Sequence, residues 1–353
     1  MKLPPRYASM PDREVAAAIA QAKARLGESL TILGHHYQCD EVIQFADFRG
    51  DSLGLSQRAT EAAQARFIVF CGVRFMAETA AMLATPEQLV VQPVAEALCP
   101  MARMADAGDV AQAWTALSGV WDGDLVPLTY QNSTADLKAF VGEHGGAVCT
   151  SSNAGRLFEW ALSRSGHILF TPDEHLGTNT ALAMGIPPKE IGIWDPAHPP
   201  DPHSLASCRV VVWKGFCRVH ANFTPQDVRQ ARDGCPDGLV VVHPECVHEV
   251  VALADSSGST TGIIRFVQQA PAGSTVFIGT EWHLVNRLSQ EHRDKTILPL
   301  RRSVCAAMSM TSMRHLLFAL DSILEGNPRN IVVVEERIAE AARVALERML
   351  VVT

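Results

Sequence analysis

The chain has 353 residues, 47% of them hydrophobic, and a formal net charge of -8 at pH 7. This length exceeds what one hydrophobic core usually organises, so we expect two or three folded domains. The negative charge argues against a nucleic-acid partner, because a phosphate backbone is held by clustered Lys and Arg. No apolar run reaches the roughly 18 residues that cross a bilayer, and the N-terminus lacks the apolar stretch of a secretory signal. We therefore expect a cytoplasmic protein that binds neither membrane nor nucleic acid.

The predicted elements begin with a helix over residues 12–26, which has apolar residues at helical spacing and ends at Gly27. After it, short β-branched runs alternate with amphipathic stretches, a pattern typical of parallel sheets flanked by helices. Four strands are expected in each third of the chain, and each ends in a polar or glycine-containing loop. They cover residues 29–33, 47–52, 66–71 and 89–94, then 125–128, 147–149, 167–170 and 209–212, then 239–242, 252–254, 275–278 and 296–298.

One α/β repeat therefore occurs three times along the chain. Each copy has a motif at the end of its first strand and a cysteine further along the chain. The separation is 64 residues from His35 to Cys99, 87 from Tyr130 to Cys217 and 62 from His243 to Cys305. A proline-rich inserted surface loop near residues 186–205 accounts for the longer middle copy. The motifs are His35-His36-Tyr37-Gln38, Tyr130-Gln131-Asn132 and His243-Pro244-Glu245, and the cysteines are Cys99, Cys217 and Cys305.

The repeats predict three similar parallel-sheet α/β/α domains around a pseudo-threefold axis. In parallel α/β sheets, ligands bind at the carboxyl ends of the strands, so the loops of three such domains would line one central active-site cavity. The predicted segments are an N-terminal helix at 1–28, α/β domains at 29–122, 123–235 and 236–322, and a C-terminal helix at 323–353.

The nine cysteines are odd in number and include no CxxC pair, which argues against a disulfide framework, a zinc finger and a ferredoxin-type run. Cys99, Cys217 and Cys305 each follow the fourth strand of their repeat, so threefold geometry would gather three thiolates around one point. Three thiolates suit a 4Fe-4S cluster whose fourth iron stays open as a Lewis acid. The alternative is that each is a buried core cysteine, but core packing has no reason to choose cysteine three times at equivalent loops.

Other cysteines fit this pattern less well. Cys39 and Cys246 both follow first-strand motifs, but the middle repeat has Ser133 at that place. Cys71 and Cys149 lie inside apolar runs, where a cysteine usually acts as a small buried hydrophobe.

Polar residues also recur in the loops at the strand ends. Hydroxyl, amide and imidazole groups suit a small ligand with carboxylate or phosphate groups, and helix starts favour anions. The alternative for each serine is a helix N-cap. The set consists of His35, Tyr37, Ser52, Tyr130, Asn132, Ser151, His243, Glu245, Ser259 and Thr260, of which His35, Tyr37, His243 and Glu245 can titrate and move protons beside a metal.

The motifs from residue 34 to about residue 320 resemble the quinolinate synthase family. They are Gly34-His35-His36-Tyr37-Gln38, Gly50-Asp51-Ser52-Leu53, Phe75-Met76-Ala77-Glu78-Thr79-Ala80, Thr129-Tyr130-Gln131-Asn132-Ser133-Thr134, Thr150-Ser151-Ser152-Asn153-Ala154, Pro172-Asp173-Glu174-His175-Leu176-Gly177, Trp213-Lys214-Gly215-Phe216-Cys217-Arg218-Val219-His220, His243-Pro244-Glu245-Cys246 and Gly258-Ser259-Thr260.

The resemblance implies a 4Fe-4S enzyme of NAD biosynthesis that condenses iminoaspartate with dihydroxyacetone phosphate to quinolinate, phosphate and water. An enzyme that oxidises aspartate would supply the iminoaspartate. The resemblance also implies cluster ligands at Cys99, Cys217 and Cys305, with Met308 lining the cavity. Catalytic roles fall on Tyr37, His243 and Glu245, and substrate contacts on His35, Ser52, Tyr130, Asn132, Ser151, His243, Glu245, Ser259 and Thr260.

Two other interpretations remain open from the residues alone. A non-catalytic iron-sulfur or redox sensor would need a partner or DNA surface, and the sequence shows none. An unrelated cluster-dependent dehydratase on the same architecture would share the cysteines. A condensation with loss of water needs no hydride carrier, which agrees with the absence of a G-x-G-x-x-G run that opens a helix.

Overall fold

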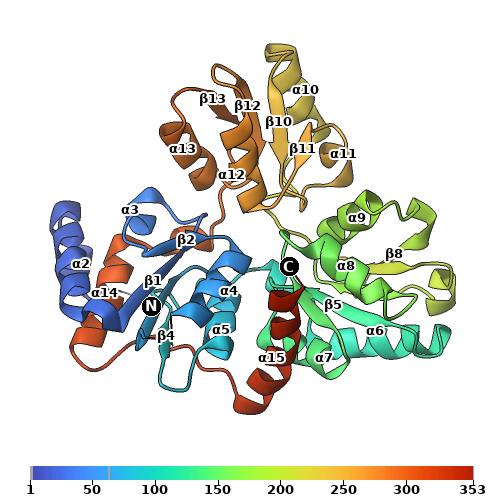
Figure 1. The fold of residues 1–353 in the computed structure, drawn as a ribbon, viewed down its shortest axis with the longest axis horizontal. Coiled ribbons are helices and arrows are strands. Elements are labelled where there is room, and N and C mark those ends of the chain that lie inside the picture. The colour runs from blue at the N-terminus through green and yellow to red at the C-terminus, as the bar shows by residue number, and fades with distance from the viewer. Residues whose placement is uncertain (1–2, 63, 353) are drawn as a thin grey trace. The chain divides into compact units, whose positions relative to one another are not determined.

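The structure of the protein is a computed structural model that describes residues 3–62 and 64–352. Within these residues the chain forms three parallel sheets of four or five strands, flanked by helices (Figure 1). The predicted class, an α/β protein with three similar parallel-sheet domains, is thus confirmed, whereas the pseudo-threefold axis and the central cavity stay predictions. Residues 1, 2, 63 and 353 belong to predicted segments but lie outside the described residues.

The chain divides into two compact units. The first contains Met1–Cys99 and Val304–Glu335, and the second contains Pro100–Ser303 and Glu336–Thr353. The first compact unit holds one of the sheets and the second holds two. The predicted segment boundaries stay predictions. In the described residues, no helix combines the length and the hydrophobicity that a membrane crossing requires.

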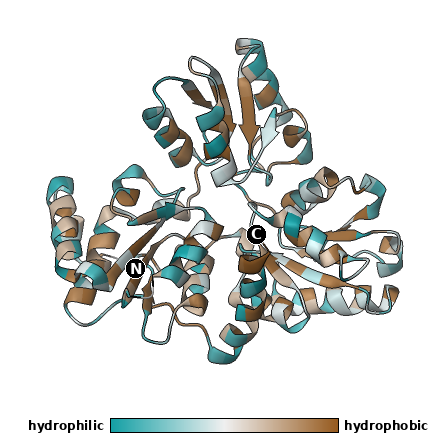
Figure 2. Ribbon diagram, in the orientation of Figure 1, coloured by the Kyte–Doolittle hydropathy of each residue, from teal (hydrophilic) through white to brown (hydrophobic). Residues whose placement is uncertain are grey.

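The sheet of the first compact unit has the strand order β2-β1-β3-β4 and is parallel throughout. Helices α2 and α14 pack together and bury Ile19 and Leu316 in one core with Ile32 and Val69 of the sheet. A sheet with helices on its faces explains the continuous apolar runs of β3 and β4 (Figure 2). The elements are α1 (Pro5–Ala8), α2 (Asp12–Leu26), β1 (Leu30–His35), α3 (Asp40–Ile43), β2 (Phe48–Gly50), α4 (Ser52–Glu61), β3 (Phe67–Cys71), α5 (Arg74–Leu83), β4 (Leu89–Val91) and α14 (Met313–Leu324).

The first sheet of the second compact unit has the order β6-β5-β7-β9-β8. Helix α15 packs on α7 and β6, and a Cβ atom on Gly142 would lie 2.0 Å from the carbonyl oxygen of Ala341. Only glycine therefore permits this close approach of the two helices. The elements are α6 (Ala107–Val120), β5 (Val126–Tyr130), α7 (Ala135–Glu143), β6 (Ala147–Cys149), α8 (Ala154–Leu162), β7 (Ile168–Thr171), α9 (Glu174–Ala183), β8 (Ile191–Trp194), β9 (Val210–Trp213) and α15 (Glu336–Val351).

The second sheet of this unit has the order β11-β10-β12-β13, again parallel. Its strand β10 is the valine run that precedes His243, and a capping box of Thr224 and Asp227 begins the helix before it. The elements are α10 (Pro225–Gly234), β10 (Leu239–Val242), α11 (His248–Val251), β11 (Ser256–Ser257), α12 (Thr260–Gln269), β12 (Thr275–Gly279), α13 (Trp282–Glu291) and β13 (Thr296–Pro299). Short 3₁₀ helices cover Gly27–Ser29, Met101–Arg103, Pro188–Glu190, Pro202–Leu205 and Met308–Met310.

Two local predictions are wrong. The strand expected at 252–254 is a turn after α11, because Ala252 donates its N–H to the His248 carbonyl and continues the helical pattern. The stretch at 186–205 is not only a surface loop, because it contains β8, which pairs with β9 at the edge of the sheet. The surrounding prolines concealed this strand, since proline is typical of loops and sheet edges.

Candidate active site

The predicted polar residues lie where the strands end and the following helices begin. Strand β1 ends at His35, β5 ends at Tyr130, and His243 directly follows β10. Ser151 lies in the turn between β6 and α8. At the helix starts, Ser52 and Thr260 are the first residues of α4 and α12, and Asp51 and Ser259 are the N-caps. The N-cap interpretation therefore holds for Ser259 and not for Ser52.

In the first compact unit, the motif after β1 is held by its own side chains. The imidazole Nδ1 of His35 accepts the backbone N–H of Tyr37 at 3.1 Å, and the two rings meet edge to face with centroids 4.7 Å apart. The buried amide of Gln38 donates to the carbonyl of Met308 at 3.1 Å. This bond places Met308 beside the motif, although 270 positions separate the two residues. Cys99 and Cys305 belong to the same unit, and both are partly buried.

In the second compact unit, Glu245 is the centre of a buried hydrogen-bonded group. The Tyr130 hydroxyl donates to its Oε1 at 2.5 Å, and Oε2 lies 2.8 Å from Nδ1 of His220. The other nitrogen of His220, Nε2, lies 3.0 Å from the hydroxyl of Thr280. The rings of His220 and His243 stack with centroids 4.2 Å apart. A phenol, a carboxylate and two imidazoles thus meet at the ends of β5, β10 and β12.

This group fixes the charge of Glu245. Burial alone would raise the pKa of its carboxyl group, but the charges of His220 and His243 and the hydrogen bonds from His220 and Tyr130 lower it. Glu245 is therefore an anion at neutral pH. Burial, followed by the negative charge of Glu245, raises the pKa of the fully buried Asp173 well above its ordinary value. The same neighbourhood thus lowers the pKa of Glu245 and raises that of Asp173, so the two acids are driven in opposite directions.

A hydroxyl pair joins the loops of the two sheets in this unit. Ser152 donates to the Oγ of Ser259 at 2.8 Å, and the same oxygen accepts the N–H of Gly262 in the first turn of α12. The predicted contacts Ser151, Ser259 and Thr260 are therefore neighbours in this part of the fold. Backbone N–H groups at a helix start are the kind of donor that binds carboxylate or phosphate.

Cys217 lies close to the buried group. Its sulfur and one ligand atom each of His220 and Glu245 lie within 4.8 Å of one another, a spacing that could hold a metal ion. However, both nitrogens of His220 and both carboxylate oxygens of Glu245 already take part in hydrogen bonds. Because these bonds account for the closeness of the imidazole and the carboxylate, the thiol is the group best suited to a metal here.

In four of the other cysteines, burial favours the protonated thiol. Burial raises the pKa of the Cys39 thiol to about 11 and that of Cys71 to about 12. Burial also raises the pKa of the thiols of Cys149 and Cys246. Metal ligation requires the thiolate, so these four cysteines favour the protonated form of a core residue.

Residue-by-residue reasoning left out three members of the site. His220 lies in the motif that contains Cys217, three residues after it. Asp173 is the second residue of the motif that starts at Pro172, and it is the N-cap of α9. Thr280 directly follows β12, so the rule that ligands collect at strand ends would have selected it. No local pattern distinguishes His220 from an ordinary core histidine, because its partners are Glu245 and Thr280, 25 and 60 positions away.

Replacing Asp173 with asparagine is expected to stabilise the protein increasingly, relative to the wild type, as the pH rises above the ordinary aspartate pKa. Above the ordinary aspartate pKa of about 3.9, the folded chain keeps a proton on Asp173 that the unfolded chain has lost, so wild-type stability falls with pH. Asparagine avoids this penalty and can still cap α9, as Asp173 does through the N–H of Leu176. The measurement is the difference in Tm between the two proteins at a series of pH values. Asp106→Asn, at the exposed N-cap of α6, is the matched control, and a Tm difference independent of pH would contradict the assignment.

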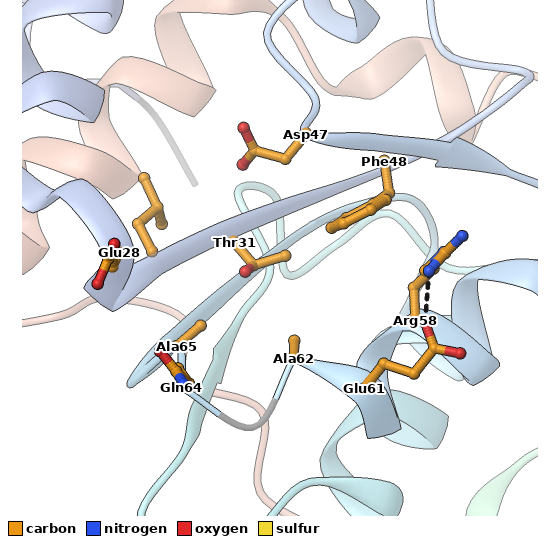
Figure 3. A pocket seen from close by; sticks show the side chains of 10 residues that line it. Glu28, Thr31, Asp47, Phe48, Arg58, Glu61, Ala62, Gln64 and Ala65 are labelled. Atoms are coloured by element: carbon orange, nitrogen blue, oxygen red, sulfur yellow. Dashed lines mark hydrogen bonds and ion pairs between the residues drawn. The ribbon is translucent and has the colours of Figure 1, made fainter.

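A hollow of about 500 Å³ lies elsewhere, in the first compact unit (Figure 3). Thr31, Asp47 and Phe48 line it at the starts of β1 and β2, and Arg58 beside it is paired with Glu61. Parallel strands start at the edge of the sheet opposite to the one at which they end. This hollow therefore lies at the opposite ends of the strands from His35 and its motif in the same unit.

The fold and the site define the class of the protein: an α/β enzyme with a buried carboxylate, imidazole and phenol group where its parallel strands end. The family model described as "Quinolinate synthetase A protein" matches residues 17–351. Proteins named quinolinate synthase from Bacillus cereus (strain AH187), Bacillus anthracis (strain CDC 684 / NRRL 3495) and Bacillus thuringiensis (strain Al Hakam) are each 45% identical over 352 residues, which cover 99% of this chain and 96% of the relative. The chain belongs to the quinolinate synthase family.

Proposed function

We propose that the protein condenses iminoaspartate with dihydroxyacetone phosphate to quinolinate, with release of phosphate and water, as a cytoplasmic enzyme of NAD biosynthesis. The observation that carries the proposal is the family match over residues 17–351, within which the buried group of Glu245 lies. An enzyme that oxidises aspartate would provide the iminoaspartate.

We further propose that Cys99, Cys217 and Cys305 hold a 4Fe-4S cluster. The donor set fits, because the three cysteines form no disulfide and lie partly buried on loops. Each loop follows the last strand expected in its sequence repeat. When bound, a cluster with three protein ligands supplies one open iron as a Lewis acid for a carboxylate or hydroxyl oxygen.

The polar residues would bind and orient the substrates. Both substrates are anionic, and the starts of α4 and α12 offer hydroxyl groups at Ser52, Ser259 and Thr260. The Oδ1 atom of Asn132 is buried and makes no hydrogen bond within the described residues, so a bound substrate can supply its donor. We assign the remaining contacts to His35, Tyr130, Ser151, His243 and Glu245.

Ring closure with loss of water requires protons to be removed from carbon and nitrogen and delivered to leaving oxygen atoms. Glu245 hydrogen-bonds Tyr130 on one side and His220 on the other, so a proton can pass between a phenol, a carboxylate and an imidazole without rearrangement. We propose Glu245 and His243 as proton-transfer residues from the second compact unit and Tyr37 as one from the first.

An assay under anaerobic conditions tests this function directly. Protein purified without oxygen is expected to contain about four iron and four sulfide ions per chain. Quinolinate is expected only when both substrates are present, and phosphate should appear with it in equal amount. A cluster-loaded protein that forms no quinolinate from these two substrates would refute the proposed reaction.

A further inference from the structure

Lys138 is a fully buried lysine directly beneath the loop that carries Tyr130 and Asn132. It lies in the first turn of α7, and its side chain is 0% exposed. The ammonium Nζ donates to the carbonyl of Gln131 at 2.8 Å and to the carbonyl of Ser133 at 2.6 Å. One cation thus holds the backbone on both sides of Asn132.

A buried lysine at this position is expected to make the fold less stable than an apolar residue would. Burial of an ammonium group costs free energy that hydrogen bonds only offset, and lysine is almost never fully buried without strong partners. A positive charge in the first turn of a helix also opposes the helix dipole. A methionine of similar length would fill the same space without these costs. The charged donors of Lys138 therefore serve a purpose that packing does not explain.

The hydrogen bonds of the loop show what the lysine holds in place. Ser133 donates its hydroxyl to the carbonyl of Tyr130 and its N–H to the carbonyl of Gln131, both at 2.8 Å. The N–H of Gln131 donates to the carbonyl of Cys149 in the neighbouring strand β6. With the two bonds from Lys138, the carbonyls of residues 130, 131 and 133 are all engaged within this unit. The backbone on both sides of Asn132 is therefore fixed.

Asn132 itself carries an unsatisfied group. Its Oδ1 is buried, and no described residue donates to it. A buried acceptor without a donor usually costs about 1–3 kcal/mol, which a ligand can recover by donating to it. The neighbouring side chain, Tyr130, reaches Glu245 at the centre of the candidate active site.

We propose that Lys138 is a positioning residue that fixes the loop at residues 131–133 so that the amide of Asn132 is presented to the substrate. This inference rests on the proposed function, because it takes the ligand of Asn132 to be the substrate or its product. In this role Lys138 acts through the backbone carbonyls of Gln131 and Ser133.

The test compares Lys138→Met, Asn132→Ala and the double variant in the anaerobically purified, cluster-loaded chain. The probe is quinolinate, titrated by calorimetry, together with KM and kcat. Lys138→Met is expected to weaken quinolinate binding and to raise KM by about tenfold, since two charge-assisted hydrogen bonds order the loop, while kcat changes less. In the double variant, the loss is expected to match that of Asn132→Ala alone, because both changes remove the same contact. Additive losses, or unchanged binding by a folded Lys138→Met protein, would overturn the proposal.

Two further variants keep the test decisive. Lys295→Met removes another largely buried lysine of the same unit, whose Nζ pairs with Asp294, and should leave binding unchanged. If Lys138→Met does not fold, Ser133→Ala removes one bond of the same loop and should weaken binding in the same direction; unchanged binding there would count against the proposal.

A structural readout separates this inference from the proposed function. Amide hydrogen exchange at residues 131–134 is expected to accelerate at least about tenfold in Lys138→Met, with β5 and α7 still protected. If the wild type neither makes nor binds quinolinate, the proposed function fails, and the exchange result still decides whether Lys138 fixes the loop. Unchanged exchange in these residues would show that it does not.

Discussion

Replacing Cys217 with alanine is expected to abolish both the iron-sulfur cluster and quinolinate formation while the protein stays folded. Cys217 lies partly buried on the loop after β9, where the lost thiol leaves only a small gap. A cluster bound by three thiolates loses a third of its protein ligands, and its open iron can no longer act as a Lewis acid. Iron and sulfide content, the visible absorption of the cluster and the thermal unfolding curve measure the three parts of the prediction. Activity should fall by at least about a thousandfold, the scale of losing a catalytic metal.

Two controls make this result specific. Cys235, which is also partly buried and ends α10, should tolerate alanine with its iron content unchanged. His220→Ala tests the neighbouring arrangement in which Cys217, His220 and Glu245 would bind a single metal ion. The cluster proposal expects that variant to keep its iron, whereas iron loss there together with normal iron in Cys99→Ala and Cys305→Ala would favour the single ion.

The fold was largely predictable because most of its strands are apolar runs that are easily recognised in the sequence. Runs such as residues 67–71 and 239–242 are apolar throughout, since helices cover both faces of their sheets, and polar loops mark where they end. β8 was missed because the prolines around it are typical of a loop, although its residues Ile191–Trp194 are apolar and Ile193 at the sheet edge is 50% exposed. The helix at Met313–Leu324 was also missed, although it packs against α2 near the other end of the chain.

The site was predictable only as far as the rule about strand ends reaches. That rule selected Tyr130, Glu245 and His243, which the structure brings together. It did not select His220, because its partner Glu245 comes near only in the folded chain. It did not select Lys138 either, because the sequence pattern does not show that this lysine is buried. Polar groups within a core are thus the part of a site that residue patterns predict least well.

Replacing Glu245 with glutamine is expected to lower kcat by about a hundredfold to ten-thousandfold, the range of a lost acid–base group, with cluster content unchanged. Glutamine keeps the shape of the side chain but removes the anion that Tyr130 and His220 share. Tyr130→Phe should have a smaller effect on proton transfer, because Glu245 then keeps its bond to His220. Steady-state rates of both variants, measured at equal iron content, test this order, and a glutamine variant with the wild-type kcat would exclude Glu245 from proton transfer.

The substitution Glu245→Gln should also alter how the stability of the protein depends on pH. Because glutamine keeps the shape of the side chain, this change reports the effect of the Glu245 charge alone. Because its pKa is lowered in the folded protein, the ionised carboxylate stabilises the fold above the ordinary glutamate pKa of about 4.3, and this contribution is lost as the pH falls below that value. The wild type should therefore exceed Glu245→Gln in Tm at pH 7, with the difference shrinking on acidification. The opposite trend is expected for Asp173→Asn, since burial and the charge of Glu245 raise the pKa of Asp173. Removal of the Glu245 charge in Glu245→Gln should also weaken the pH dependence of stability that Asp173 confers. The change in Tm of the double variant should therefore differ from the sum of the changes in the two single variants.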